Sequence, residues 1–405
     1  MRVQQINTTL NSSAPGKIAE EIGKVLQAHG HESYIGYGRR SRPSASHSVK
    51  IGNFVDQSFH GVITRLFDLH GFGSAGATRK FVKKVREINP DIIHLHNIHG
   101  YFINLEVLFE YLKETGKPVV WTLHDCWPFT GHCSHFDFVD CQKWRTQCFE
   151  CPNKQVYPRS LLLDNSRSNY LRKREAFSGL KSLTIVTPSD WLKAHVENSF
   201  LKEYRTITIN NGIDLNVFRT ETGTTPLTEK LKSDGRKMVL GVANLWGKHK
   251  GLADFVRLSA DLPENYHIVL VGLNKVQQKN LPRNITGISR TESVQELAAL
   301  YAAADVFVNP TYVDNFPTTN IEALACGTPV ITYDTGGSPE AISETTGHIV
   351  RKGDIPGLMA SVRLFCENGK NHYSAACRNR AEALYDKNER FNDYINLFRS
   401  LLQNK

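Results

Sequence analysis

The chain of 405 residues lacks any run of about 20 apolar residues, which is the length that a membrane-spanning helix needs. Its first residues, MRVQQINTTLNSSAPG, lack the apolar core and cleavage site of a secretory signal. It also lacks internal repeats and low-complexity segments. These absences argue against a secreted or membrane-spanning protein. They predict a soluble, cytoplasmic one.

What is present is globular material, since hydrophobic residues make up 40% of the chain. The length suits two or three domains. The net charge is +9, and residues 1–190 hold 24 Lys and Arg against 17 Asp and Glu. A basic first half favours an anionic partner, and nucleic acid, a membrane surface and a phosphorylated acceptor all fit. A solvated surface with a chance excess of charge is the alternative.

Short β-branched runs alternate with helical patterns along the whole chain, which predicts parallel sheets covered by helices on both faces. The expected strands are residues 3–6, 32–37, 91–95, 118–122 and 183–187 in the first half, and 237–242, 267–271, 284–287, 305–309 and 329–332 in the second half.

The fold class is therefore α/β, with two doubly wound, Rossmann-like domains that face a central cleft. The expected parts are a first domain at 1–218 with a Cys-rich insertion at 126–160, a Thr- and Gly-rich linker at 219–236, a second domain at 237–385, and a C-terminal helix at 386–405 that packs back on the first domain. Ligands of such sheets bind at the carboxyl ends of the strands.

The most informative segment is DNFPTTNIEALACGTPV, residues 314–330. It follows an expected strand and opens a helix at about Pro317, where a missing N–H costs nothing. The N–H groups of Thr318 and Thr319 would face an anion. Glu322, one turn further on, can accept hydrogen bonds from ribose hydroxyls. The alternative is a capped helix on a sheet, with Glu322 as an exposed charge.

This segment resembles the signature of the retaining family 4 glycosyltransferases, which have two Rossmann-like domains in the GT-B arrangement. The resemblance extends over nearly the whole chain, through residues 186–192 (VTPSDWL), 211–214 (NGID) and 336–340 (GGSPE). Residues 123–127 (LHDCW) and the cysteines after them are similar to bacterial exopolysaccharide enzymes of the colanic acid type.

The resemblance implies roles for the residues of the second domain. Glu322 matches the residue that holds the donor's ribose, and Lys250 matches the lysine at the donor pyrophosphate. Asp314 matches the acidic position that faces the donor sugar, although the common pattern has the longer Glu. An arginine common in the family is replaced by Asn244, and we hypothesise that Lys248 supplies its charge. Asn315, Phe316, Pro317, Thr318 and Thr319 complete the expected donor site.

The first domain is expected to supply the other wall. The loop Asn11–Lys17 precedes an expected helix at 18–29, and it lacks the spacing of a Walker or dinucleotide fingerprint. By resemblance, its Gly16 contacts the donor. His124 and Asp125 end an expected strand, and the resemblance places a His there near the donor sugar. Together with Asp314 they are the predicted catalytic residues. The alternative for His124 is a structural histidine. A further cluster, His94, His96 and His99, lacks a paired ligand set, so packing and acceptor contact are favoured over a metal.

The expected reaction is the transfer of a hexose, with retention, from a nucleotide sugar, most simply a UDP-hexose. The acceptor would be a saccharide on a polyprenyl diphosphate in colanic acid-like polysaccharide synthesis. Lys250, Lys248 and the helix N-terminus near Pro317 would stabilise the leaving phosphate. The leaving β-phosphate would act as the base, and no cofactor is expected in catalysis.

Five of the eight cysteines lie between residues 126 and 151. Cys133, Cys141, Cys148 and Cys151 offer four thiolates, with His132 and His135 nearby, and four thiolates suit a structural zinc ion. Disulfides are not expected in a reducing cytoplasm. The alternative is a set of free thiols in an ordered insertion.

Two segments are candidates for a membrane surface. Residues 59–69 (FHGVITRLFDL) place Val62, Leu66 and Leu69 near one helical face, and residues 79–86 (RKFVKKVR) form a basic amphipathic stretch. The alternative is a pair of core-facing helices. The prediction is a peripheral protein on the cytoplasmic face of the inner membrane.

Two other classes of function stay open. A sugar-nucleotide epimerase or a phosphorylase could share the architecture, but the Asp314 to Glu322 signature argues against both. A non-catalytic binding protein, for example for nucleic acid, would need aromatic residues interleaved in a basic groove, and the sequence has none. We therefore expect no nucleic-acid partner.

Overall fold

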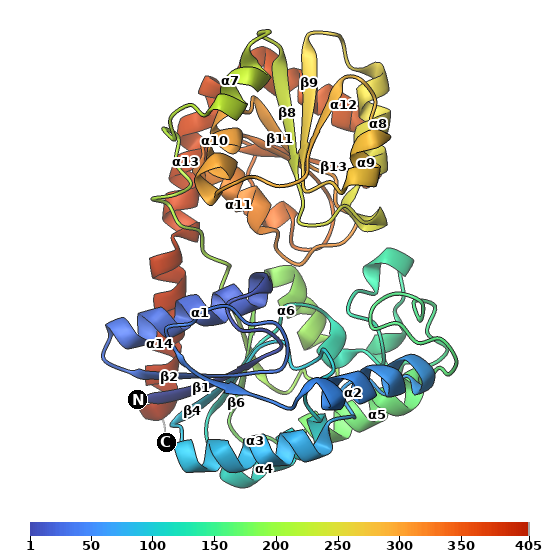
Figure 1. The fold of residues 1–405 in the computed structure, drawn as a ribbon, viewed down its shortest axis with the longest axis vertical. Helices are drawn as coiled ribbons and strands as arrows, with labels where there is room; N and C mark the ends of the chain where they lie inside the picture. Colours follow the sequence, from blue (N-terminus) through green and yellow to red (C-terminus); the bar gives the residue numbers. More distant parts are fainter. Residues whose placement is uncertain (404–405) are drawn as a thin grey trace. The chain divides into compact units, whose positions relative to one another are not determined.

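The computed structural model describes residues 1–403 and divides into two compact units (Figure 1). Unit 1 comprises Met1–Ile209 and the segment that begins at Phe391, and unit 2 comprises Asn210–Arg390. Each unit is built around its own parallel sheet.

The sheet of unit 1 has seven strands in the order β3-β2-β1-β4-β5-β6-β7, and every pairing is parallel. The strands are β1 (Arg2–Asn7), β2 (Glu32–Tyr37), β3 (His47–Lys50), β4 (Ile92–Leu95), β5 (Val119–Thr122), β6 (Leu183–Thr187) and β7 (Arg205–Thr208).

Alternate residues of these strands enter two different cores, as the two-residue repeat of a strand requires. Ile93 and Trp121 face one core, whereas Ile92 and Val120 face the other. The helices are α1 (Ser13–Ala28), α2 (Phe54–Phe67), α3 (Ala75–Ile88), α4 (Leu105–Thr115), α5 (Ser166–Phe177) and α6 (Asp190–Glu197). Figure 1 shows α3 and α4 on one side of the sheet and α1 on the other.

The last helix, α14 (Lys387–Gln403), begins in unit 2 and continues in unit 1. Its apolar residues share the α1-side core with Val3, Ile22 and Ile92. These residues of α14 are Phe391, Tyr394, Ile395, Leu397 and Phe398. The burial of this face is what holds the C-terminal segment on unit 1.

Unit 2 has a six-stranded parallel sheet in the order β10-β9-β8-β11-β12-β13. The strands are β8 (Lys237–Val242), β9 (Tyr266–Val271), β10 (Ile285–Ile288), β11 (Val306–Asn309), β12 (Val330–Tyr333) and β13 (Gly347–Val350). The helices are α7 (Pro226–Lys232), α8 (Leu252–Asp261), α9 (Lys275–Lys279), α10 (Val294–Ala303), α11 (Thr318–Ala325), α12 (Ile355–Asn368) and α13 (Lys370–Tyr385). Figure 1 shows α8 and α12 on one side of the sheet and α11 and α13 on the other.

All ten strands expected from the sequence are present, with ends that differ by no more than one residue. Three further strands, β3, β7 and β13, were not expected. Each of them lies at an edge of its sheet and is partly exposed. An edge strand needs no continuous apolar run, so its sequence lacks the signal that marks a central strand.

The division between the units also differs from the expected one. The expected first domain ended at residue 218, whereas unit 1 gives way to unit 2 after Ile209. The expected linker at 219–236 contains α7, whose Leu231 is buried in the core of unit 2. Composition alone could not reveal this, because a Thr-rich stretch with one buried leucine looks like a linker. Within residues 1–403, no helix combines the length and the apolarity that a membrane span requires.

Candidate active site

The predicted donor residues of unit 2 lie at the switch point of its sheet. The order of the strands changes direction between β8 and β11, and ligands of open α/β sheets bind at the carboxyl ends of such strands. Lys248 and Lys250 form the short 3₁₀ helix η4 (Lys248–Lys250) that follows β8, and residues 314–322 follow β11.

Lys250 and Asp314 form an ion pair at this edge. The Nζ atom of Lys250 lies 2.6 Å from Oδ2 of Asp314 and 3.5 Å from Oγ1 of Thr311. The two loops are joined by the backbone as well, since the N–H of Tyr312 donates to the carbonyl of His249 over 2.8 Å. Both charged side chains remain partly exposed, at 28% and 20%, so a ligand can reach them.

Gly251 allows these loops to approach each other. Its φ of 76° lies in the left-handed region, and a Cβ atom there would stand 2.2 Å from the carbonyl oxygen of Pro310. Any other residue would therefore push the loop of Lys250 away from the loop that follows β11.

The helix α11 begins at Thr318, and Pro317 is the residue directly before it. The sequence analysis placed Pro317 inside the first turn, which is one residue too early. Thr318 and Thr319 are partly exposed. Their N–H groups belong to the first turn, where helix geometry provides no carbonyl partner. Together with the helix dipole, they can stabilise an anion beside Lys250.

Glu322 is held by a residue that the sequence analysis missed. The hydroxyl of Tyr301, on α10, donates to Oε2 of Glu322 over 2.9 Å. Burial, and then the neighbouring Glu322, raise the pKa of Tyr301, so the phenol stays protonated and remains a donor. Tyr301 carries no sequence signal other than its place in an apolar helix.

A buried network connects α11 to the loop after β12. Nδ2 of Asn309 donates to Oδ1 of Asn320 over 2.8 Å, and Nδ2 of Asn320 lies 3.0 Å from Oγ of Ser338. In the same loop Gly336 has a φ of 56°, and a Cβ there would stand 1.8 Å from the carbonyl oxygen of Asp314. The GGSPE loop thus packs against Asp314, which explains its need for glycine.

Not all of the predicted donor residues expose their side chains to a ligand. Phe316 is buried in the core of unit 2, with its ring 5.7 Å from that of Tyr385, and Asn315 and Pro317 are buried too. Phe316 therefore supports the loop from inside. Lys248, in contrast, is exposed on the same 3₁₀ helix as Lys250.

Unit 1 has a switch point between β1 and β4. Gly16 lies inside α1, which begins at Ser13, and not in the loop before a helix that starts at residue 18. A Cβ at Gly16 would stand 2.5 Å from Oγ1 of Thr9. The glycine therefore lets the loop after β1 pack on the first turn of α1.

The carboxyl ends of β4 and β5 bring four polar side chains together. Nδ1 of His96 lies 3.2 Å from Nε2 of His124. Nε2 of His99 lies 2.8 Å from Oδ2 of Asp125, and its Nδ1 lies 3.1 Å from the hydroxyl of Tyr157. The sequence analysis did not identify Tyr157, which comes from the insertion.

The charge states of this cluster follow from burial. Burial lowers the pKa of His124 to about 4, so its imidazole is neutral at pH 7. Burial alone would raise the pKa of Asp125, but the charge and hydrogen bond of His99 hold it at about 2. A neutral imidazole beside a carboxylate provides acceptors for the hydroxyl groups of a sugar.

His94, in contrast, lies in the core. Nε2 of His94 lies 2.8 Å from Oγ1 of Thr122, and its ring lies 5.3 Å from that of Tyr394 on α14. Across residues 1–403, no group of three or more His, Cys, Asp and Glu side chains stands in a geometry that could hold a metal ion. The packing interpretation of this histidine is the one that its surroundings favour.

The four predicted zinc ligands lie around one small pocket of unit 1. Cys133, Cys141, Cys148 and Cys151 all contribute to its lining, as does His132. All four thiols are free of disulfides.

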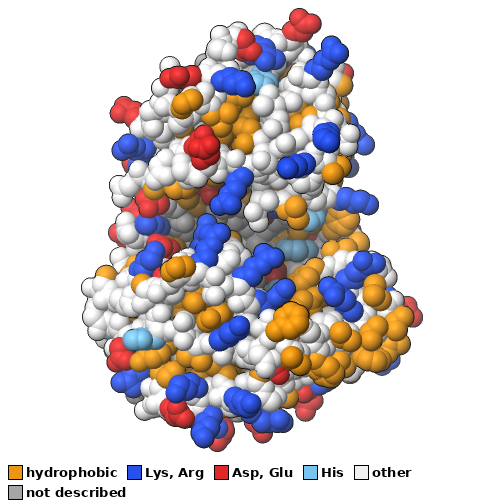
Figure 2. Space-filling view, viewed as in Figure 1, with side chains coloured by type: hydrophobic (Ala, Val, Ile, Leu, Met, Phe, Trp, Pro, Cys, Tyr) orange, Lys and Arg blue, Asp and Glu red, His pale blue; other side chains and the backbone are white. Residues whose placement is uncertain are grey.

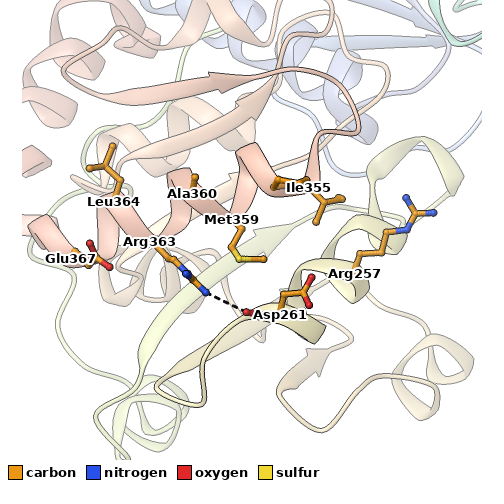
Figure 3. A pocket seen from close by; sticks show the side chains of 9 residues that line it. Arg257, Asp261, Ile355, Met359, Ala360, Arg363, Leu364 and Glu367 are labelled. Atoms are coloured by element: carbon orange, nitrogen blue, oxygen red, sulfur yellow. Dashed lines mark hydrogen bonds between the residues drawn. The ribbon is translucent and has the colours of Figure 1, made fainter.

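A wider hollow lies elsewhere in unit 2, between α8 and α12 (Figure 3). Arg257 and Asp261 come from α8, and the guanidinium of Arg363, on α12, donates to the carbonyl of Asp261 over 3.5 Å. None of the predicted donor residues lines this hollow. We therefore place the candidate site at the strand ends and not here.

Comparison with known proteins agrees with this geometry. The family described as Glycosyltransferase Family 4 matches residues 16–217, and the family described as Glycosyl transferases group 1 matches residues 236–368. Together they account for most of both units. The chain belongs to these glycosyltransferases, and it is an enzyme of the transferase class.

Individual relatives extend over different shares of the chain. The Escherichia coli K12 protein WcaC, named as a glycosyl transferase of colanic acid biosynthesis, is 26% identical over 99% of this chain and 100% of its own. A Campylobacter jejuni enzyme is 28% identical over 44% of this chain and 48% of its own. It is named N,N'-diacetylbacillosaminyl-diphospho-undecaprenol alpha-1,3-N-acetylgalactosaminyltransferase.

Solved structures of low sequence identity show the same fold. Sucrose-phosphate synthase of Thermosynechococcus elongatus superposes with a TM-score of 0.71 at 17% identity, over the whole of both chains. HepE of Anabaena, in complex with UDP, superposes with a TM-score of 0.67 at 16% identity, over 99% of this chain and 100% of that one. The two parallel-sheet units therefore have the GT-B fold.

Proposed function

We propose that unit 2 binds a nucleotide-diphosphate sugar, most simply a UDP-hexose, at the carboxyl ends of β8 and β11. The observation that carries this proposal is the grouping of Lys250, Asp314, the start of α11 and Glu322 at one switch point. A diphosphate needs a cation and backbone N–H groups. A ribose diol needs a carboxylate that is held in place, and Tyr301 holds Glu322.

In the proposed reaction the bond between the anomeric carbon and the β-phosphate breaks while the acceptor hydroxyl attacks from the same face. Configuration is then retained. Negative charge grows on the leaving phosphate, and Lys250 and the first turn of α11 stabilise it. Lys250 would exchange its contact with Asp314 for one with phosphate, which frees the carboxylate to accept a hydrogen bond from the sugar. An oxygen of the leaving phosphate takes the acceptor's proton. Lys248 would add charge.

The acceptor would contact unit 1. His124 and Asp125 follow β5, where they offer a neutral imidazole and a carboxylate. His96 contacts His124 and His99 contacts Asp125, and Gln5 in turn contacts His96. We infer that the bound group is a sugar, because a neutral imidazole and a carboxylate accept hydrogen bonds from hydroxyls and do not attract an anion.

The proposed acceptor is a saccharide on a polyprenyl diphosphate, and the proposed pathway is the synthesis of colanic acid or a related extracellular polysaccharide. The likeness to WcaC along the full chain supports the pathway. The name of the Campylobacter relative, which includes a diphospho-undecaprenol acceptor, supports the lipid carrier.

A lipid-linked acceptor requires a membrane surface, and α2 supports one. Its buried residues are the polar His60 and Thr64, whereas Phe54 and Phe59 are 82% and 63% exposed. A surface helix normally buries its apolar face and exposes its polar face, and α2 does the reverse. The α2 patch consists of Phe54, Val55, Phe59, Val62, Phe67, Leu161, Leu162 and Leu163.

The insertion completes the α2 patch. The N–H of Leu161 donates to the carbonyl of Arg65 over 2.7 Å, and that of Leu163 to the carbonyl of Leu66 over 3.2 Å. Figure 2 shows hydrophobic side chains gathered on this part of unit 1, with Lys and Arg among them. Arg65 and Arg159 are exposed beside the patch. We propose that the α2 patch rests on a membrane with anionic lipids, on the cytoplasmic face of the inner membrane.

The second segment that the sequence suggested for membrane contact has another role. In α3 the apolar residues Phe81, Val82 and Val85 are buried in the core of unit 1. The helix is therefore core-facing, with its lysines and arginines on the outside. The exposed face of α2 also differs from the expected one, since Leu66 is partly buried. Leu69 lies beyond the end of α2 and is partly buried as well.

The donor proposal is tested by thermal unfolding with a panel of UDP- and GDP-sugars, because a ligand of the folded state raises its stability. One donor should raise the midpoint of the wild type and leave that of Glu322→Gln unchanged. The matched control is Glu367→Gln, in the hollow of Figure 3, which should respond like the wild type. If no sugar nucleotide stabilises the wild type, or if Glu322→Gln responds fully, the proposed pocket is wrong.

A further inference from the structure

The insertion between β5 and α5 has little regular structure of its own. It contains only three short 3₁₀ helices: η1 (Trp127–Phe129), η2 (Asp137–Val139) and η3 (Lys143–Arg145). Yet it supplies Tyr157 to the His99 cluster and Leu161–Leu163 to the α2 patch. A segment with so little regular secondary structure needs some other source of order.

The pocket of this insertion collects sulfur atoms. Cys133, Cys141, Cys148 and Cys151 all line it. The thiols of Cys133 and Cys151 are hydrogen-bonded to each other, and the N–H of Gly131 donates to Sγ of Cys148 over 3.2 Å. Four thiols from residues 133–151 are thus held around one small space by a segment that contains no disulfide.

A second observation comes from His132, which also lines the pocket. Its Nδ1 lies 2.5 Å from Oδ1 of Asp68, and both side chains are almost fully buried. Its Nε2 is buried and makes no hydrogen bond within the described chain. The buried carboxylate fixes the orientation of this ring, so that its other nitrogen can either bind a metal ion in the pocket or contact a sulfur atom that does.

A buried lysine lies close to the same thiols. Lys173, on α5, donates to the carbonyls of Trp127 and Thr130 over 2.8 and 3.0 Å, and Cys148 and Cys133 are among its electrostatic neighbours. A positive charge here would offset part of the negative charge of a thiolate cluster.

We propose that this pocket binds one Zn²⁺ ion through the thiolates of Cys133, Cys141, Cys148 and Cys151. Within residues 1–403 no three potential ligands already stand in a metal-holding geometry, so the four sulfur atoms must move together as the ion binds and each thiol loses its proton. The pocket holds five candidate ligands for four places. Thiolates take them because they are charged and soft, and His132 then contacts a sulfur atom from outside. The ion joins the start of the insertion, next to Asp125, to the end that carries Tyr157.

The experiment uses the full chain, prepared in zinc-containing medium with a reducing agent and dialysed extensively. Metal content by mass spectrometry should be one zinc per wild-type chain and near zero for Cys148→Ser and Cys141→Ser. The matched control is Cys126→Ala, a buried cysteine of the same insertion that does not line the pocket; it should keep one zinc. Replacement by Co²⁺ should give the strong sulfur-to-metal absorption of a tetrahedral thiolate site.

Wild-type protein without bound zinc, or a Cys148→Ser variant that retains it, would overturn the proposal. His132→Ala distinguishes the ligand set: it should keep the metal. If His132→Ala loses the zinc while Cys141→Ser keeps it, the ligands are three thiolates and an imidazole, and the four-thiolate assignment is wrong. Because the pocket lies in unit 1, zinc loss should leave the sugar-nucleotide shift of unit 2 intact, so this inference and the donor proposal can fail separately.

Discussion

The two units share one strand order around their switch points, but they place different chemistry there. Unit 2 brings Lys250, Asp314 and Glu322 to the strand ends, with a helix N-terminus beside them. Unit 1 brings His96, His99 and His124 to the same kind of edge. The comparison teaches that the fold determines where a ligand binds, whereas the side chains determine whether a charged or an uncharged ligand is preferred. Unit 2 suits a diphosphate, and unit 1 suits an uncharged sugar.

The largest effect is expected at Lys250. Lys250→Ala removes the cation that faces the leaving phosphate, so kcat/KM for glycosyl transfer should fall by about 100- to 1,000-fold, the usual cost of one oxyanion-stabilising group. Initial rates with the donor that stabilises the wild type measure this. Lys248→Ala is the control on the same 3₁₀ helix and should lose far less. Equal losses in the two variants would mean that unit 2 has no single phosphate-facing lysine.

The next effect concerns the buried histidines of unit 1. Burial lowers the pKa of His94 to about 3 and that of His60 to about 4, well below 6.5. The folded state therefore holds both imidazoles in the neutral form. Above pH 6.5 they cost the protein no stability, but as the pH falls below 6.5 the unfolded chain takes up protons that the folded chain does not, and the free energy of unfolding decreases. Between pH 6.5 and 5, each should cost about 2 kcal/mol of unfolding free energy.

Urea unfolding of the wild type and of His94→Gln, at pH 7 and pH 5, measures this effect. The glutamine can keep a hydrogen bond to Thr122 but does not titrate, so the variant should depend less on pH. His29→Gln, at an exposed position of the same unit, should behave like the wild type. An unchanged pH slope in His94→Gln would show that this histidine is not the acid-sensitive group.

A smaller effect is expected at the α2 patch. Phe59→Ser should weaken binding to anionic phosphatidylglycerol vesicles by roughly 10- to 100-fold, because insertion of one exposed phenylalanine contributes about 1.5–3 kcal/mol. Co-sedimentation with vesicles measures it. Leu245→Ser is the matched control, since Leu245 is 67% exposed in unit 2. If both variants bind as the wild type does, α2 is not the membrane-facing surface.

The smallest effect is expected for Tyr301→Phe. This change removes only the hydroxyl that donates to Glu322, so the KM for the donor should rise a few-fold, in line with about 1 kcal/mol for one hydrogen bond. The value of kcat should stay close to that of the wild type. A large fall in kcat, with KM unchanged, would mean that Tyr301 has another role.

Much of the architecture could be predicted from the sequence, because buried parallel strands need continuous apolar runs. Most of the ten expected strands had them, although β1 (RVQQIN) is interrupted by Gln4 and Gln5. The missed strands, β3, β7 and β13, are partly exposed edges that need no such run. The position of Lys250 and Glu322 near the strand ends was predictable too, since their motifs directly follow strands. Their partners Asp314 and Tyr301 come from other loops and helices, and single-sequence patterns do not report such distant contacts.

The sequence by itself determined that the chain forms two α/β units and which loops carry the charged and cysteine motifs, because local hydrophobic period and motif spacing are properties of neighbouring residues. Only the tertiary structure decided which way each amphipathic face points. It buried the apolar face of α3 and exposed that of α2. It also brought four cysteines and His132 to one pocket, with Asp68 hydrogen-bonded to His132. These outcomes depend on packing between segments far apart in the chain, which no local pattern records.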